Sequence, residues 1–159
     1  MFRRKLVSLA FCLMGGLSLA GVGSAANEMH HAALCNPLST SDAAKIGYSR
    51  WGIHNNSETQ SATISCGAIL PEQIRRAGVS ARVYDRHGTQ DVCCTARWQD
   101  RFSGDTLSAV SACTGGFDSA MLTLSMSLPA QLVHNASLEC TIPPKTANGL
   151  SHVAAWVVN

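Results

Sequence analysis

Imidazole side chains are the first candidates for chemistry in this sequence, which has six histidines. No two of them fall in a His-Glu-x-x-His frame or at another spacing that would place two metal ligands on one face of a helix. The Met29-His30-His31 trio combines soft and imidazole ligands suited to copper, but we expect it to be a solvated tail. The sequence therefore predicts no metal site and no other cofactor.

Nucleophilic catalysis by serine typically uses a Gly-x-Ser-x-Gly turn between a strand and a helix. Residues 47–52 come closest, with Ser49 among them, but the segment is one residue too long and no helix is expected after it. A Ser-His-Asp triad assembled from distant parts of the chain stays open. Gly115-Gly116 is interpreted as a turn rather than a phosphate-binding loop. We therefore predict no catalytic residue and a non-enzymatic protein, with a secreted hydrolase as the alternative.

Surface recognition is the remaining kind of chemistry. If residues 79–85 pair with residues 92–98 as a hairpin, Arg82 and Tyr84 lie near Arg97 on its outward face. Guanidinium groups beside an aromatic ring bind sugars or anionic ligands, so these three residues form the predicted ligand patch. A solvated sheet face is the plainer interpretation. A carbohydrate platform could also use the three tryptophans, Trp51, Trp98 and Trp156.

Seven cysteines are many for a chain of 159 residues, and one of them, Cys12, lies in a distinctive leading segment. Residues 1–5 carry three positive charges, an apolar run extends over residues 6–22, and small residues follow up to Ala26. This succession is typical of a secretory signal peptide, and we expect cleavage after Ala25 or Ala26.

Removal of residues 1–26 changes the charge and the cysteine count. Residues 27–159, predicted to form a single domain, hold nine basic and ten acidic side chains, a net charge of −1 that does not suggest nucleic-acid binding. None of their apolar runs is long enough to span a membrane. They retain six cysteines, an even number that predicts disulfides in an oxidising compartment. We expect the domain to be exported, to the periplasm or to the extracellular space.

The elements that must position these residues are predicted to be strands. The clearest is residues 122–128, whose four apolar residues alternate with polar ones and so share one face. Seven further runs show strand patterns: residues 47–54, 61–66, 79–85, 92–98, 106–113, 136–142 and 152–158. The polar segment 27–45 is expected to be irregular, and residues 71–76, which begin with a proline, to form a single helical turn. About eight short strands predict an all-β fold, an antiparallel β-sandwich after a cleaved signal helix.

The expected registers indicate which cysteines pair. We expect residues 92–98 to pair with residues 106–113 through the intervening turn. Cys93 then lies opposite Cys113, close enough for a bridge, while Cys94 points to the other face and needs a partner on another strand. The predicted pairs are Cys93–Cys113, Cys94–Cys140 and Cys35–Cys66. A redox pair or metal site at Cys93-Cys94 is the alternative, although no Cys-x-x-Cys motif or zinc spacing supports it.

Short motifs follow one another in a definite order: Tyr48, Gly52-Ile53-His54-Asn55, Cys66, Val83-Tyr84-Asp85, Val92-Cys93-Cys94-Thr95 and Leu138-Glu139-Cys140-Thr141-Ile142-Pro143. Over about residues 48–158 this order resembles that of a group of small exported proteobacterial proteins of unknown function. Gly67 stands where those proteins often have a proline. The resemblance implies an exported, disulfide-bearing β-sandwich, and it supplies no catalytic residue.

Together these patterns predict an exported, disulfide-stabilised, non-enzymatic β-sandwich that serves as a binding or envelope-associated module. Its expected partner is a ligand not identified by the sequence, with carbohydrate as the first class to test.

Overall fold

A computed structural model describes residues 27–70, 75–100, 102–118, 120–132 and 135–159, so the predicted signal peptide at residues 1–26 lies outside the described residues. The helical elements are η1 (Ala32–Leu34) and α1 (Thr40–Ala43). The strands are β1 (Glu28–His31), β2 (Asn36–Pro37), β3 (Ile46–Ser49), β4 (Gly52–Asn55), β5 (Ala62–Ile69), β6 (Arg75–Tyr84), β7 (Cys93–Gln99), β8 (Thr106–Cys113), β9 (Leu122–Leu132), β10 (Asn135–Ile142) and β11 (His152–Val158). Among the described residues, no helix is long and apolar enough to cross a membrane.

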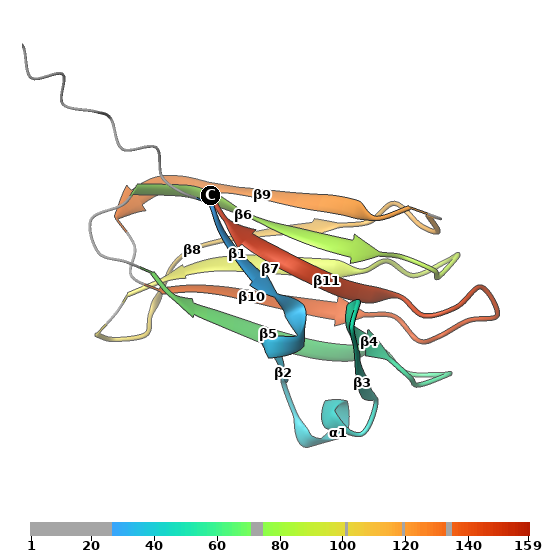
Figure 1. Cartoon of the computed structure of the whole chain (residues 1–159). Coiled ribbons are helices and arrows are strands. Elements are labelled where there is room, and N and C mark those ends of the chain that lie inside the picture. The colour runs from blue at the N-terminus through green and yellow to red at the C-terminus, as the bar shows by residue number, and fades with distance from the viewer. Residues whose placement is uncertain (1–26, 71–74, 101, 119, 133–134) are drawn as a thin grey trace, which may run out of the picture.

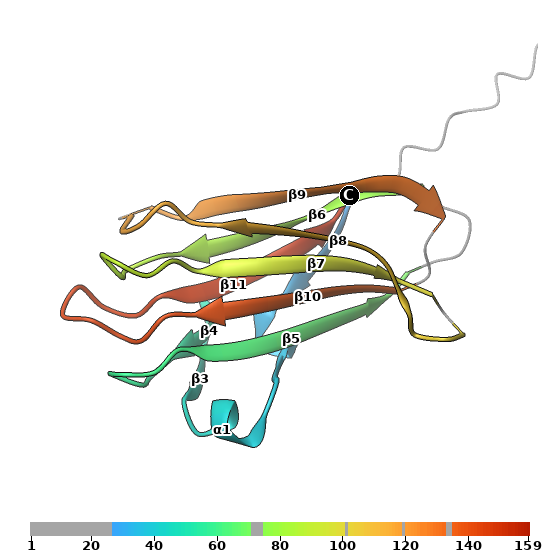
Figure 2. The same cartoon turned by 180° about the vertical axis from the view of Figure 1, so that it is seen from behind.

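The strands form two antiparallel sheets packed face to face (Figures 1 and 2). The first sheet has the order β3-β4-β11-β6-β9, and β1 also pairs with β11. The second sheet has the order β2-β5-β10-β7-β8. The predicted all-β sandwich is confirmed, and its strands follow from the alternation of apolar and polar residues: β10, for example, alternates between half-buried and buried positions along its whole length.

The core lies between the sheets and contains two tryptophans. Trp98 of β7 and Trp156 of β11 are almost completely buried. The indole of Trp98 donates a hydrogen bond to the carbonyl of Pro129 at 3.2 Å, so its polar group is satisfied inside the core. Each sheet contributes the apolar side chains of its inward positions, as expected for a sandwich.

Three sequence-based predictions of local structure were wrong. Residues 27–45 are not irregular, because they contain β1, η1, β2 and α1. The Met29-His30-His31 trio is not a tail: it belongs to β1, and the His30 ring stacks on Trp156 with 4.7 Å between ring centroids. The helical turn expected at residues 71–76 is contradicted where the structure describes it, since β6 begins at Arg75; residues 71–74 lie outside the described residues.

The predicted hairpin between residues 79–85 and 92–98 is also wrong. β6 belongs to the first sheet, where it pairs with β9 and β11, and β7 belongs to the second, where it pairs with β8 and β10. The polar connection between them therefore crosses from one sheet to the other. A short segment with glycine fits either a hairpin or such a crossing, and the alternation within a strand does not specify its neighbour.

Among the described residues the structure contains three disulfides, Cys35–Cys66, Cys93–Cys113 and Cys94–Cys140, which are the three predicted pairs. Cys93 lies opposite Cys113 in the pairing of β7 with β8, and Cys94 lies opposite Cys140 in the pairing of β7 with β10. Disulfides in this number are typical of proteins that fold outside the cytoplasm.

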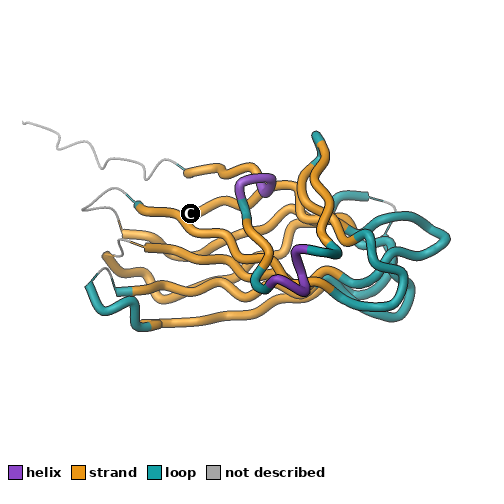
Figure 3. Tube along the Cα trace, turned by 90° about the horizontal axis from the view of Figure 1, so that it is seen from below, coloured by secondary structure: helices purple, strands orange, loops and turns teal. Residues whose placement is uncertain are grey.

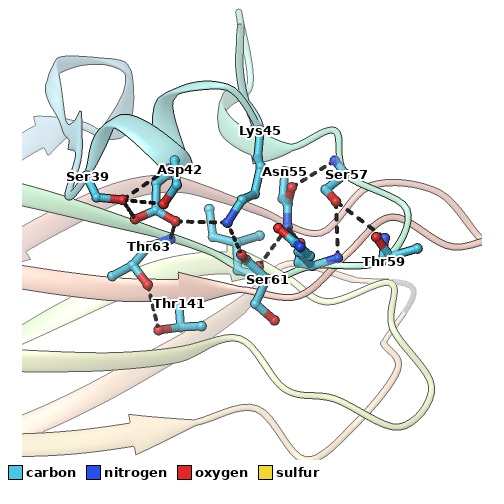
Figure 4. A network of polar contacts seen from close by, with 12 residues as sticks. Ser39, Asp42, Lys45, Asn55, Ser57, Thr59, Ser61, Thr63 and Thr141 are labelled. Carbon is cyan, nitrogen blue, oxygen red and sulfur yellow. Dashed lines mark hydrogen bonds and ion pairs between the residues drawn. The ribbon is translucent and has the colours of Figure 1, made fainter.

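A network of polar contacts ties α1 to the edge of the second sheet (Figure 4). The hydroxyl of Ser39 caps α1 by accepting a hydrogen bond from the backbone N–H of Asp42 at 3.1 Å. The Asp42 carboxylate accepts the backbone N–H of Thr63 at 3.2 Å, and Lys45 donates to the carbonyl of Ser61 at 3.1 Å. The hydrogen bond from the Ser39 hydroxyl is the main cause that lowers the pKa of Asp42 below its ordinary value.

Asn55, the last residue of β4, is completely buried and joins three segments. Its side-chain N–H groups donate to the carbonyls of Gln60, Ile142 and Pro143 at 2.8 to 3.1 Å, and its side-chain oxygen accepts the backbone N–H of Ser57 at 2.9 Å. Asn55 therefore fixes the end of β4 against the carboxyl end of β10.

Candidate functional site

A row of polar and aromatic side chains crosses three neighbouring strands of the first sheet. His152 at the start of β11 lies opposite His54 of β4 on one side and opposite Tyr84 of β6 on the other. Their sequence neighbours Ile53 and Val153 are completely buried, so alternation places the row on the outward face. The rings of Tyr84 and His152 are in contact, with 4.5 Å between their centroids and a tilt of 32°.

The turn between β3 and β4 adds an exposed tryptophan to this row. Trp51 remains 59% exposed, and the Arg50 guanidinium lies 4.8 Å from the centre of its ring. The Ser49 hydroxyl accepts the Trp51 backbone N–H at 3.2 Å, which shapes the turn. Gly52 follows with φ at +126°, and a Cβ atom there would lie 2.0 Å from the carbonyl oxygen of Val153. Only glycine lets the hairpin pack this closely on β11.

Several loops gather at one end of the sandwich (Figure 3). Three of the connections between strands converge on the buried carboxylate of Asp85, the residue that follows β6. One of its oxygens accepts the backbone N–H of His87 at 2.9 Å and the hydroxyl of Ser151 at 3.1 Å. The other accepts the backbone N–H of Val92 at 3.3 Å and the hydroxyl of Thr114. Asp85 therefore joins the β6–β7, β8–β9 and β10–β11 connections.

This arrangement holds the backbone of Arg86 on both sides. Its N–H donates to the Ser151 hydroxyl at 2.8 Å, and its carbonyl accepts the Thr146 hydroxyl at 2.9 Å. The guanidinium extends over two aromatic rings, 5.9 Å from the centre of Tyr84 and 5.8 Å from that of Phe117. Both distances lie within the range of cation–π attraction.

These residues surround an open hollow on the outward face of the first sheet, which we call the hollow from here on. One part of it, with a volume of about 220 Å³, is lined by Trp51, Tyr84, Arg86 and His152. The adjoining part, of about 420 Å³, is lined by Ser49, Trp51, His54, Arg86, Gly149, Leu150 and His152. The two parts share three side chains, so they form one continuous surface of aromatic and cationic groups.

His152 is the titratable group in the hollow with a shifted pKa. Burial is the main cause that lowers the pKa of His152 below its ordinary value of 6.5, and the neighbouring charges of His54 and Arg86 act in the same direction. The hydrogen bond to the carbonyl of Leu150, which has the second largest effect after burial, opposes the shift. At neutral pH the His152 ring is therefore uncharged, and Arg86 carries the permanent positive charge of the hollow.

The arrangement is suited to binding. The Trp51 ring offers an apolar surface to a ligand, while the imidazoles and the guanidinium offer hydrogen-bond donors. None of the described residues that line the hollow has a carboxylate. The contacts described for the Ser49 hydroxyl are with the Trp51 N–H and the Gly52 carbonyl rather than with a histidine. The secreted hydrolase of the sequence analysis stays a prediction.

The structure separates the residues of the predicted ligand patch. Arg82 and Tyr84 share the outward face of β6, and Tyr84 lines the hollow. Arg97 lies on β7 in the other sheet, where it forms an ion pair of 3.2 Å with Glu139 of β10. Because the expected hairpin does not form, Arg97 is not beside the other two. Whether these residues bind a ligand is still a prediction.

Sequence reasoning did not bring together Trp51, His54, Arg86 and His152. Trp51 and His54 lie in one predicted strand, residues 47–54, but Arg86 and His152 lie in other segments of the chain. The missing information is that β4, β11 and β6 are neighbours, although they are far apart in the chain. The alternation in residues 152–158 indicated that His152 is at a strand end, but not which strands flank it.

The sequence matches no protein-family model, and no curated protein is similar to it. Its fold is similar to solved structures. The CBM36-1 domain of a multidomain xylanase, from the hindgut metagenome of Trinervitermes trinervoides, matches with a TM-score of 0.50 and 9% identity over 84% of this chain and 97% of that one. CsCBM6-3 from Clostridium stercorarium, in complex with cellobiose, matches with a TM-score of 0.50 and 13% identity over 83% and 92% of the two chains.

A family two carbohydrate esterase from Cellvibrio japonicus matches over 84% of this chain and 33% of that one, with a TM-score of 0.49 and 7% identity, so this chain spans about a third of that protein. At these identities the likeness shows the fold alone, a disulfide-bearing version of the β-sandwich found in carbohydrate-binding modules. The likeness assigns no family or taxon, and the resemblance to exported proteobacterial proteins stays a prediction.

Proposed function

We propose that this protein is an exported, non-catalytic module that binds carbohydrate in the hollow of the first sheet. The observation that carries the proposal is the exposed Trp51 ring beside a row of polar groups with fixed backbones. The fold shared with carbohydrate-binding modules and the three disulfides support the binding role and the export, respectively.

The chemistry of the hollow fits a sugar ring. Sugars have apolar C–H faces and a rim of hydroxyls, so they need an aromatic surface together with polar groups around it. Trp51, with more than half of its surface exposed, supplies the surface, and the pair of Tyr84 and His152 extends it. Hydroxyls would be bound by the ring nitrogens of His54 and His152 and by the guanidinium of Arg86. The volume of about 420 Å³ lies within the range of small-ligand sites.

Binding by the full chain to immobilised glycans tests the proposal. We expect Trp51→Ala to weaken binding by about tenfold or more, equivalent to about 1.4 kcal/mol, and Tyr84→Ala to weaken it as well. The matched control is Ile69→Ala, because Ile69 is an apolar residue of the second sheet and is 84% exposed. Equal loss in the control, or no binding to any glycan, would contradict the proposal. Release of sugar from a bound glycan would instead favour the hydrolase.

A further inference from the structure

We infer that the hollow selects an acidic sugar, a saccharide whose ring carries a carboxylate, and that Arg86 binds the carboxylate. The inference rests on the proposed function and names the class of sugar that the hollow takes. Three features carry it: the charges that line the hollow, the position of Arg86, and the hydrogen bonds that the carboxylates of the adjoining loops accept.

The lining of the hollow carries a net positive charge. Among the described residues, it contains the guanidinium of Arg86 and the neutral imidazole of His152 beside that of His54, and no Asp or Glu side chain. A second guanidinium, that of Arg50, lies over the Trp51 ring. A neutral sugar gains nothing from this excess of positive charge, whereas a carboxylate is attracted to it.

The carboxylates of the β6–β7 and β8–β9 connections accept hydrogen bonds within these connections or from neighbouring ones. Asp85 is completely buried and accepts hydrogen bonds from three loops. Asp91 accepts the backbone N–H of Gly116 at 2.7 Å, and Asp118 accepts the backbone N–H of Ala120 at 2.8 Å. Each of these acids holds a loop in place, and none of them lines the hollow.

Arg86 is in a position to recognise a carboxylate. Its backbone is fixed by Ser151 and Thr146, so less conformational freedom is lost when a ligand binds. Its guanidinium lies within cation–π range of the rings of Tyr84 and Phe117. The planar fork of a guanidinium matches the two oxygens of a carboxylate and forms paired, charge-assisted hydrogen bonds.

The experiment measures binding of the full chain, near neutral pH and physiological salt, to two oligosaccharides of equal length. One is an oligogalacturonate, and the other is the neutral oligogalactose of the same linkage. We expect the oligogalacturonate to bind at least about tenfold more tightly. Arg86→Gln should remove most of this difference, because it weakens binding of the oligogalacturonate far more than binding of the neutral oligosaccharide. Arg82→Gln is the matched control, because Arg82 is an exposed arginine of β6 that does not line the hollow, and the difference should persist.

The outcomes separate this inference from the proposed function. If both oligosaccharides bind equally, or the neutral one binds more tightly, the inference is wrong and carbohydrate binding stands. If neither these two nor any glycan of the array binds, the proposed function fails as well. Polyglutamate serves as an acidic polymer without sugar rings, and binding as tight as that of oligogalacturonate would overturn the inference. Thermal unfolding verifies that Arg86→Gln is folded. If it is not, the second variant is Arg50→Gln, which removes the exposed guanidinium beside Trp51 and should reduce the preference for oligogalacturonate in part. An unchanged preference in Arg50→Gln counts against the inference.

Discussion

Asp85 shows how a residue that does not line the hollow determines its geometry. Its carboxylate sits between the two sheets' loops and takes four hydrogen bonds, one of them from the Ser151 hydroxyl that also accepts the N–H of Arg86. A buried acceptor with this many donors is costly to replace, because each donor left unsatisfied loses roughly 1–3 kcal/mol. The hydrogen bonds around Asp85 and Ser151 therefore fix the backbone from which the Arg86 guanidinium extends.

His152 makes the stability of the protein depend on pH. Its pKa in the folded state is below 6.5, so the folded protein binds its proton less readily than the unfolded chain does. Above pH 6.5 the ring is neutral in both states and the contribution to stability is fully present. As the pH falls below 6.5, the unfolded chain takes up the proton first, and stability decreases until the folded-state pKa is reached.

We therefore expect His152→Gln to reduce the loss of stability on acidification. Urea unfolding of both proteins between about pH 8 and pH 5 measures the effect, since the pH dependence reports the difference in bound protons. The free energy of unfolding of the wild-type protein should fall more steeply over this window than that of the variant. Equal slopes would show that His152 does not titrate with a lowered pKa.

The β3–β4 hairpin is the element that distinguishes the hollow from a bare sheet face. It holds Trp51 at its turn, and its contact with β11 leaves no room for a side chain at Gly52. In the β-sandwich, β4 pairs with two residues of β11, while β1 pairs with the remainder of the same edge. The hairpin is thus held by few backbone hydrogen bonds, and close packing at Gly52 matters correspondingly more.

Gly52→Ala is expected to displace this hairpin. A Cβ atom would contact the Val153 carbonyl, and a non-glycine residue at φ +126° is strained, so stability should decrease by roughly 2 kcal/mol or more. Glycan binding should weaken with it, because Trp51 moves. The matched control is Gly67→Ala in β5, where a Cβ atom would meet nothing within 4 Å. Thermal unfolding and glycan binding measure both variants, and similar behaviour of the two would refute the role given to Gly52.

Strands could be predicted from the sequence where one face of the strand is buried and the other is exposed to solvent. Residues 106–113 and 152–158 coincide with β8 and β11, although a bulge after Val153 interrupts the alternation of β11 and places Trp156 in the core. The pairing of β7 with β8 was also accessible, since the two strands follow each other with a short turn. The partners of β6 could not be predicted, because β9 and β11 lie further along the chain. The alternation within β6 is the same whichever strands lie beside β6. The hollow depends on those partners, and so it could not be predicted.

The N-terminal segment, expected to be irregular, links the two sheets of the whole molecule. β1 adds to the first sheet and β2 to the second, with η1 and Cys35 between them. The Cys35–Cys66 disulfide joins this segment to β5, and the other two disulfides join β7 to its neighbours β8 and β10. All three bonds therefore anchor strands of the second sheet, while the hollow lies on the first.

The three disulfides should differ in their reactivity because they differ in exposure. Cys113 is exposed and Cys93 half-buried, whereas the cysteines of the other two bonds are at most 3% exposed. A mild reductant reaches an exposed disulfide in the folded protein but needs unfolding to reach a buried one. We expect Cys93–Cys113 to open first, with glycan binding retained, since the bond lies in the sheet that does not form the hollow.

Alkylation of the native protein during reduction, followed by peptide mass spectrometry, gives the order in which the bonds open. Cys93 and Cys113 should be labelled while the other four cysteines of the described residues are still protected. Full reduction should then lower the free energy of unfolding by about 2–5 kcal/mol for each further bond and abolish binding through loss of the fold. Labelling of Cys94 and Cys140 at the same rate as Cys93 would mean that the second sheet opens locally under native conditions. Burial of the Cys94–Cys140 disulfide would then not protect it from the reductant.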